Sequence, residues 1–95
     1  MIKAVIGEIV LAESDETIRL EGNFYFPPDS VRWEHLTPSA TRTVCPWKGV
    51  ARYHDLTDAV GGAKDVAWSY PRPWPLARRI RGYVAFWNGV HVVTP

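Results

Sequence analysis

The chain has 95 residues, of which 46% are hydrophobic and 22% charged, a composition that is typical of a folded globular domain and excludes a disordered tail. Eleven basic and ten acidic residues leave a net charge of +1, so no overall basic field attracts the chain to nucleic acid. The single cysteine excludes an internal disulfide framework and a zinc site of the four-cysteine or two-cysteine, two-histidine kind.

The first half of the chain predicts short strands. They are expected at residues 1–11, 17–20 and 23–26. Gly7 marks a bulge or bend in the first strand, and Pro27 and Pro28 end regular pairing after the third. The best helical stretch is 29–36, because either of its first two residues can cap a helix.

The second half predicts further strands with two glycine turns. The strands are expected at residues 47–56, 64–70, 82–87 and 90–93. Gly61-Gly62 indicates a hairpin loop, and Asn88-Gly89 is the dipeptide of a type I′ hairpin. Segment 39–43 is a polar run of Ser and Thr, and 76–80 has room for one helical turn. About seven short strands with one or two short helices predict a mainly β fold.

Two motifs carry a resemblance to a known family. They are Thr43-Val44-Cys45-Pro46-Trp47-Lys48-Gly49 and Ala67-Trp68-Ser69-Tyr70-Pro71-Arg72-Pro73. In this order they resemble the bacterial domain of unknown function 427, and the likeness runs from about Ala4 to Val93. The resemblance implies a β-tent-like fold, in which two antiparallel sheets meet along one edge and splay open, as in the thalidomide-binding domain of cereblon. The family is sometimes labelled a nucleotidyltransferase domain, but the chain has neither a P-loop nor a paired-aspartate motif.

The leading interpretation is a module that binds an unknown small molecule in an aromatic cleft between the two sheets. Its expected lining consists of Lys48, Tyr53, Trp68, Tyr70 and Phe86, with Cys45 at the polar floor. In the cereblon-like relative, tryptophans on such strands cage a cyclic imide, so we expect a planar ligand that is anionic or carries an amide. The competing interpretation assigns the same aromatic rings to the hydrophobic core.

The second interpretation is a thiol-dependent or nucleotidyltransferase-like enzyme that acts through Cys45 and Lys48. A lysine three residues from the thiol favours the thiolate, and His54 is the candidate base. The simpler alternative makes Cys45 a small buried apolar residue. Likewise, Lys48 is either a functional cation or an ordinary charge that is solvated, lies at a sheet edge or pairs with an acid such as Asp65.

Arginines supply two further candidates. Lys48 with Arg52 and Arg72 is a candidate anion site, where Gly49 would let a ligand approach the backbone closely. Arg78-Arg79, followed by Arg81, is a local basic cluster, but the balanced net charge argues against a nucleic-acid partner.

The third interpretation is a protein-interaction module, in which exposed Trp33, Trp74 and Trp87 mark the surface for a partner or a homodimer. In every interpretation we expect a single domain over residues 1–95, located in the cytoplasm. No apolar run is long enough for a transmembrane helix, so no membrane partner is expected. The residues imply no cofactor, and the scattered histidines do not have metal-ligand spacing.

Overall fold

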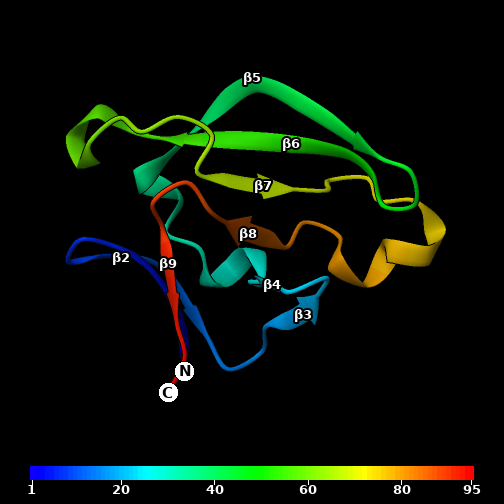
Figure 1. Cartoon of the computed structure of the whole chain (residues 1–95), viewed down its shortest axis with the longest axis horizontal. Helices are drawn as coiled ribbons and strands as arrows, with labels where there is room; N and C mark the ends of the chain where they lie inside the picture. The colour runs from blue at the N-terminus through cyan, green and yellow to red at the C-terminus, as the bar shows by residue number, and fades with distance from the viewer.

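Nine strands make three antiparallel sheets in the computed structural model, which describes residues 1–95 (Figure 1). The first sheet, in the order β2-β1-β9, contains β1 (Ile2–Ile6), β2 (Ile9–Ser14) and β9 (His91–Val93). The second is the hairpin of β3 (Ile18–Leu20) and β4 (Asn23–Tyr25). The third, in the order β5-β6-β7-β8, contains β5 (Leu36–Cys45), β6 (Gly49–Leu56), β7 (Ala67–Ser69) and β8 (Val84–Phe86). The chain is mainly β, as predicted, although it has three sheets and not two.

All helical structure consists of short 3-10 turns. These are η1 (Pro28–Ser30), η2 (Trp33–His35), η3 (Asp58–Val60) and η4 (Pro75–Ile80). The single helix predicted over 29–36 is therefore wrong. Between η1 and η2 the Arg32 amide donates to the Leu11 carbonyl at 2.8 Å, and Val31 forms a β-bridge with Ala12. This pairing with β2 extends the chain where a continuous helix would need a turn.

The longest strand, β5, includes the polar segment 39–43, where no strand was expected. Pairing with β6 holds β5 in place on both sides of an irregularity in its register. At that irregularity the Asp65 carboxylate accepts hydrogen bonds from Ser39 Oγ at 2.6 Å and Thr41 Oγ1 at 2.8 Å. These bonds lower the pKa of Asp65. The side chains that make the segment look like a loop are thus the ones that fix it as a strand.

Two turns differ from the prediction. The expected first strand is a hairpin of β1 and β2 that turns at Gly7, whose φ is +57°. Asn88 and Gly89 have the positive φ angles of the expected turn, but β9 pairs with β1 and not with β8. The Trp87 indole and the Asn88 amide both donate to the Asp65 carbonyl, at 2.6 and 3.0 Å. We infer that these bonds hold the chain away from β8 as it turns toward the first sheet.

The four-stranded sheet has two faces of different composition. Because paired residues of antiparallel strands share a face, the register assigns each side chain to one of them. The Tyr53 face carries Thr43, Cys45, Ala51, Tyr53, Trp68 and Ala85. The Arg52 face carries Arg42, Val50, Arg52, His54, Ala67, Ser69, Val84 and Phe86.

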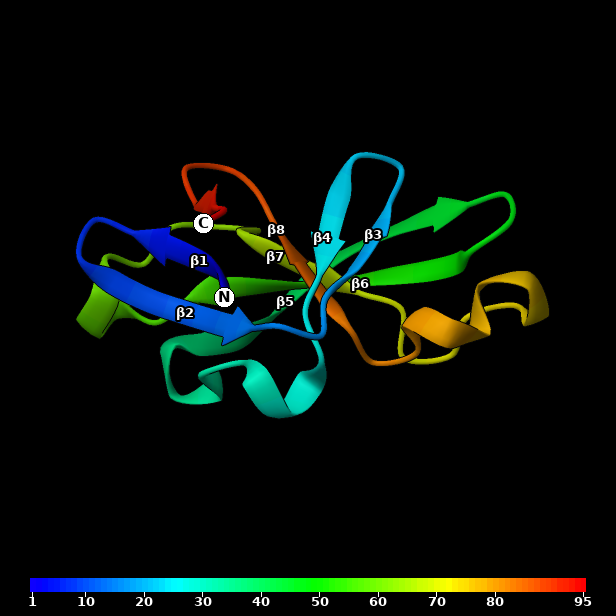
Figure 2. The same ribbon diagram turned by 90° about the horizontal axis from the view of Figure 1, so that it is seen from below.

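The hairpin of β3 and β4 extends the four-stranded sheet beyond β8. Phe26 and Val84 exchange backbone hydrogen bonds of 2.8 and 2.9 Å, which join the end of the hairpin to β8. Figure 1 shows the resulting succession from β5 down to β3, and Figure 2 shows the hairpin between the first sheet and η4. Phe26 and Phe86 pack edge to face at 5.7 Å in the larger core cluster, which includes residues of the first sheet.

A smaller core cluster lies on the Tyr53 face. Its buried members are Tyr25, Ala51, Tyr70, Ala77, Ile80 and Ala85. Half-buried residues pack around them, among them Cys45, Trp47, Tyr53 and Trp68. This cluster forms the base of the candidate site.

Candidate functional site

A pocket of about 180 Å³ opens between the β3–β4 hairpin and the four-stranded sheet. Its lining consists of Asn23, Tyr25, Lys48, Tyr53, Trp68, Tyr70 and Trp87. We call it the Lys48 pocket. It has one cationic group among five aromatic rings, drawn from β4, the β5–β6 turn, β6, β7 and the segments after β7 and β8.

Four of the five aromatic residues of the Lys48 pocket contact one another in a connected set. Trp68 packs edge to face against Trp87 at 5.5 Å and against Tyr25 at 6.3 Å. Tyr53 lies tilted against both tryptophans, with centroid distances of 6.4 and 6.3 Å. Rings that brace one another in this way present faces of fixed orientation to a ligand.

Lys48 is the buried charge of the pocket. Only 7% of the residue is exposed, and its ammonium group forms an ion pair with the Glu21 carboxylate. The ammonium also lies 5.6 Å from the centroid of Tyr70 and 5.4 Å from that of Trp47, which are cation–π distances. Burial lowers the pKa of Lys48, because it penalises the charged form.

Glu21 reaches Lys48 from the tip of the β3–β4 hairpin. It has a φ of +52°, in the left-handed region that a residue with a side chain seldom adopts, and Gly22 follows with +81°. Its carboxylate also accepts a hydrogen bond from Trp47 Nε1 at 3.3 Å. The hairpin tip is thus tied to the β5–β6 turn, and this link holds one edge of the pocket.

Three tyrosines line the pocket and bring hydroxyl groups to it. Burial raises the pKa of Tyr25 and of Tyr70, so both hydroxyls stay protonated at neutral pH. The Tyr25 hydroxyl accepts a hydrogen bond from Trp68 Nε1 at 3.3 Å, and the Tyr53 hydroxyl lies 3.0 Å from Thr43 Oγ1. A hydroxyl both donates and accepts, so these groups complement a ligand carbonyl or amide.

A model of a family described as a domain of unknown function (DUF427) matches residues 1–94. The chain belongs to this family. The resemblance noted from the sequence is therefore confirmed, and the short name of the family model refers to nucleotidyl transfer. No curated protein matches this DUF427 chain. None of its helical turns has the length and hydrophobicity needed to span a bilayer.

Four of the ligand-binding residues predicted for this DUF427 domain come together in the Lys48 pocket. They are Lys48, Tyr53, Trp68 and Tyr70. Phe86 does not join them, because the partner of Trp68 across the sheet is Ala85. One step along β8, Phe86 therefore points to the Arg52 face, where it packs in the larger core cluster.

Cys45 lies on the Tyr53 face, half-buried in the smaller core cluster. His54, its candidate base, lies on the Arg52 face, where its ring packs against Trp33 at 5.4 Å. The sheet separates the two side chains, so the structure does not assemble a Cys45–His54 pair. It also places Lys48 in an ion pair with Glu21 and not with Asp65.

The expected anion site of Lys48, Arg52 and Arg72 is divided between two pockets. Lys48 lines one pocket, and the two arginines line another on the Arg52 face. The open space expected at Gly49 is also filled by the protein itself, because the Trp74 backbone passes over it.

Several residues of the Lys48 pocket and its edge were not predicted. Tyr25 and Asn23 come from the hairpin, and Glu21 forms an edge of the pocket through its ion pair with Lys48. The sequence does carry a signal for Glu21, since Glu21-Gly22 is a two-residue link between two predicted strands and therefore the tip of a hairpin. Trp87 has no such signal, because it follows β8 and its orientation depends on the bond to Asp65.

Proposed function

We propose that this DUF427 domain binds a small molecule with one flat ring and a carboxylate, carbonyl or amide group in the Lys48 pocket. The observation that supports the proposal best is the Lys48 ammonium, which is buried among aromatic rings and has one carboxylate partner. Keeping a cation out of water costs free energy unless it is paired. An anionic or strongly polar ligand would add a second partner and offset more of that cost.

The size of the pocket suits a single ring. Its volume of about 180 Å³ is close to that of a cavity of roughly 150 Å³ that holds benzene in another protein. A ring stacked on an aromatic side chain gains on the order of 1–3 kcal/mol. A hydrogen bond to the ammonium gains roughly 1.5–3 kcal/mol more. The pocket thus offers a stacking surface and one charged hydrogen-bond donor, which favour a ligand with one ring and one polar group.

Two alternatives have less support. Nucleophilic chemistry at Cys45 lacks the expected base, because His54 lies on the other face of the sheet. A single docking surface built on tryptophans also has little support, because Trp33 is at η2, Trp74 lines the pocket on the Arg52 face and Trp87 borders the Lys48 pocket.

The proposal is tested by thermal shift with a panel of aromatic carboxylates, cyclic amides, nucleobases and nucleosides. A ligand at about 100 times its Kd should stabilise the domain by about 2.7 kcal/mol. In a domain of this size each kcal/mol raises Tm by about 4–8 °C. We expect Lys48→Met and Trp68→Phe to lose most of the shift, each measured against its own ligand-free Tm.

Trp33→Ala serves as the matched control, because Trp33 is an exposed tryptophan outside both pockets and should keep the full shift. Shifts that persist in Lys48→Met and Trp68→Phe would place the ligand elsewhere. A panel without any stabilising compound would reject a single-ring ligand of these classes.

A further inference from the structure

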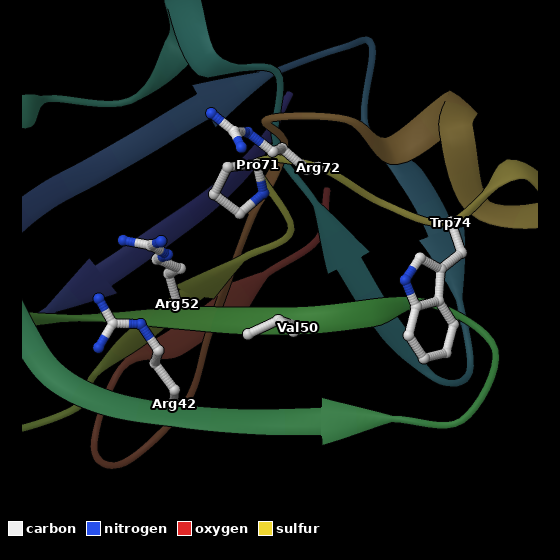
Figure 3. A pocket seen from close by; sticks show the side chains of 6 residues that line it. All are labelled: Arg42, Val50, Arg52, Pro71, Arg72 and Trp74. Atoms are coloured by element: carbon white, nitrogen blue, oxygen red, sulfur yellow. The ribbon is translucent and has the colours of Figure 1, made fainter.

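A second and larger pocket lies on the Arg52 face, with a volume of about 510 Å³. Its lining consists of Arg42, Val50, Arg52, Pro71, Arg72 and Trp74 (Figure 3). It shares no residue with the Lys48 pocket, and we call it the arginine pocket.

The arginine pocket concentrates positive charge without a compensating acid. Arg42 and Arg52 are direct cross-strand partners, and the segment after β7 adds Arg72. No carboxylate lines the pocket, and none of the ion pairs in the structure includes these three arginines. Like charges directly opposite each other across two strands are destabilising. An anion bound between them would remove that repulsion.

Backbone contacts hold the remaining wall in position. The Trp74 amide donates to the Lys48 carbonyl at 3.0 Å. Gly49 has a φ of +111°, and a Cβ at this position would lie 3.4 Å from the Trp74 nitrogen. The segment that carries Arg72 and Trp74 therefore runs close against the β5–β6 turn, and a side chain on Gly49 would be strained there.

The two ends of the arginine pocket differ in chemistry. In Figure 3 the three guanidinium groups gather at one end, the Trp74 indole lies at the other, and Val50 lies between them. Val50 is 40% exposed and Trp74 is 43% exposed, so both offer apolar surface to a ligand. The Trp74 indole nitrogen makes no hydrogen bond within the protein.

We propose that the arginine pocket binds a small organic phosphate that carries a flat ring. The planar guanidinium forks of Arg42, Arg52 and Arg72 match phosphate oxygens in bidentate geometry, and their three positive charges more than neutralise its double negative charge. The ring lies over Val50 and against the Trp74 indole. This site is on the opposite face of the sheet from the Lys48 pocket and does not depend on that pocket being occupied.

The test uses 1-naphthyl phosphate, inorganic phosphate and 1-naphthol in separate NMR titrations of the whole chain. We expect 1-naphthyl phosphate to shift the Trp74 indole resonance and the arginine Nε resonances, with a Kd at least 10-fold lower than that of inorganic phosphate. We expect 1-naphthol to leave them unchanged. Arg52→Gln and Arg72→Gln should each weaken 1-naphthyl phosphate binding about 10-fold. Trp74→Ala should bring its Kd close to that of inorganic phosphate.

Arg79→Gln is the matched control, because Arg79 is an exposed arginine on η4 outside the pocket and should leave the Kd within 2-fold. Equal weakening by Arg52→Gln and Arg79→Gln would mean a diffuse charge effect and would overturn the proposal. So would shifts confined to the Trp68 indole of the Lys48 pocket, or an absence of shifts at millimolar ligand. A single-stranded oligothymidine that bound more tightly than 1-naphthyl phosphate and needed Arg79 would identify a nucleic-acid surface instead.

Discussion

Tyr53 and Arg52 are neighbours in β6, yet they face two sites with opposite ways of accommodating positive charge. On the Tyr53 face one ammonium is buried and paired with Glu21. On the Arg52 face three guanidinium groups stay exposed and unpaired around a larger pocket. The alternation of side chains along one strand thus separates one buried, paired charge from exposed, unpaired ones. The balanced net charge of the chain conceals this separation.

The two sites differ in the source of their unfavourable free energy. In the Lys48 pocket the unfavourable contribution is the desolvation of the ammonium, which nothing would offset without the Glu21 carboxylate. The arginine pocket carries like-charge repulsion, which water and salt largely screen. We therefore expect variants of Lys48 or Glu21 to change stability as well as ligand binding, and variants of Arg42 or Arg52 to change ligand binding with little effect on stability.

The largest effect should come from Phe86, the β8 residue that packs in the larger core cluster and not in the Lys48 pocket. Phe86→Ala removes a ring that packs against Phe26 in the larger core cluster, and we expect it to lower the free energy of unfolding by about 3–5 kcal/mol. Trp87→Ala removes a ring that is 46% exposed, and we expect a loss of less than about 2 kcal/mol, mainly from its bond to the Asp65 carbonyl. Urea denaturation of both variants measures the difference. Equal losses would show that the sheet face on which each of these two neighbours lies does not determine its contribution to stability.

The next effect concerns the two partners of the buried ion pair. Glu21→Gln keeps the shape of the side chain but leaves the Lys48 ammonium buried without its carboxylate, and we expect a loss of about 1–3 kcal/mol. Lys48→Met leaves Glu21 half-exposed to water and fills the same space with an apolar chain, so its loss should be smaller. Urea denaturation at neutral pH, with both variants beside the unmodified chain, gives the order. The reverse order would mean that Lys48 contributes mainly through its packing on Tyr70.

The sequence predicted elements better than it predicted their pairing. Its apolar and β-branched runs located most of the strands, the family motifs located Lys48, Trp68 and Tyr70, and the strand expected at 47–56 supplied Tyr53. It missed β5 at 39–43, because the bonds that fix Ser39 and Thr41 come from Asp65, 24 or more residues away.

Two expectations about the site differ from the structure for the same reason. One placed Phe86 in the ligand pocket, and the other joined Lys48 with Arg52 in one anion site. Whether Phe86 or Trp87 faces the Lys48 pocket depends on the register between β7 and β8, which the composition of β8 does not determine. The separation of Lys48 from Arg52 depends likewise on how the β5–β6 turn directs one side chain toward the hairpin. Composition indicates which residues can form a site, and long-range pairing decides which of them do.

The smallest effect should come from His54, which lies on the same face as the exposed arginines but is half-buried beneath Trp33. Its Nδ1 is buried without a hydrogen-bond partner, and burial lowers the pKa of His54, against a smaller opposite influence of Asp55. In the unfolded chain a histidine titrates near pH 6.5, roughly its unperturbed value. As the pH falls below that value, this histidine binds a proton in the unfolded chain, whereas in the folded chain it does so only at lower pH.

The free energy of unfolding should therefore be highest above the unfolded pKa and decrease as the pH falls toward the folded pKa, by at most about 1.4 kcal/mol per pH unit. Urea denaturation between pH 7.5 and 5.5 measures this slope. His54→Phe keeps a ring against Trp33 and should flatten it, whereas His91→Gln, at an exposed histidine, should not. An unchanged slope in His54→Phe would mean that folding leaves the pKa of His54 at its unfolded value, so that burial beneath Trp33 does not disfavour the charged ring.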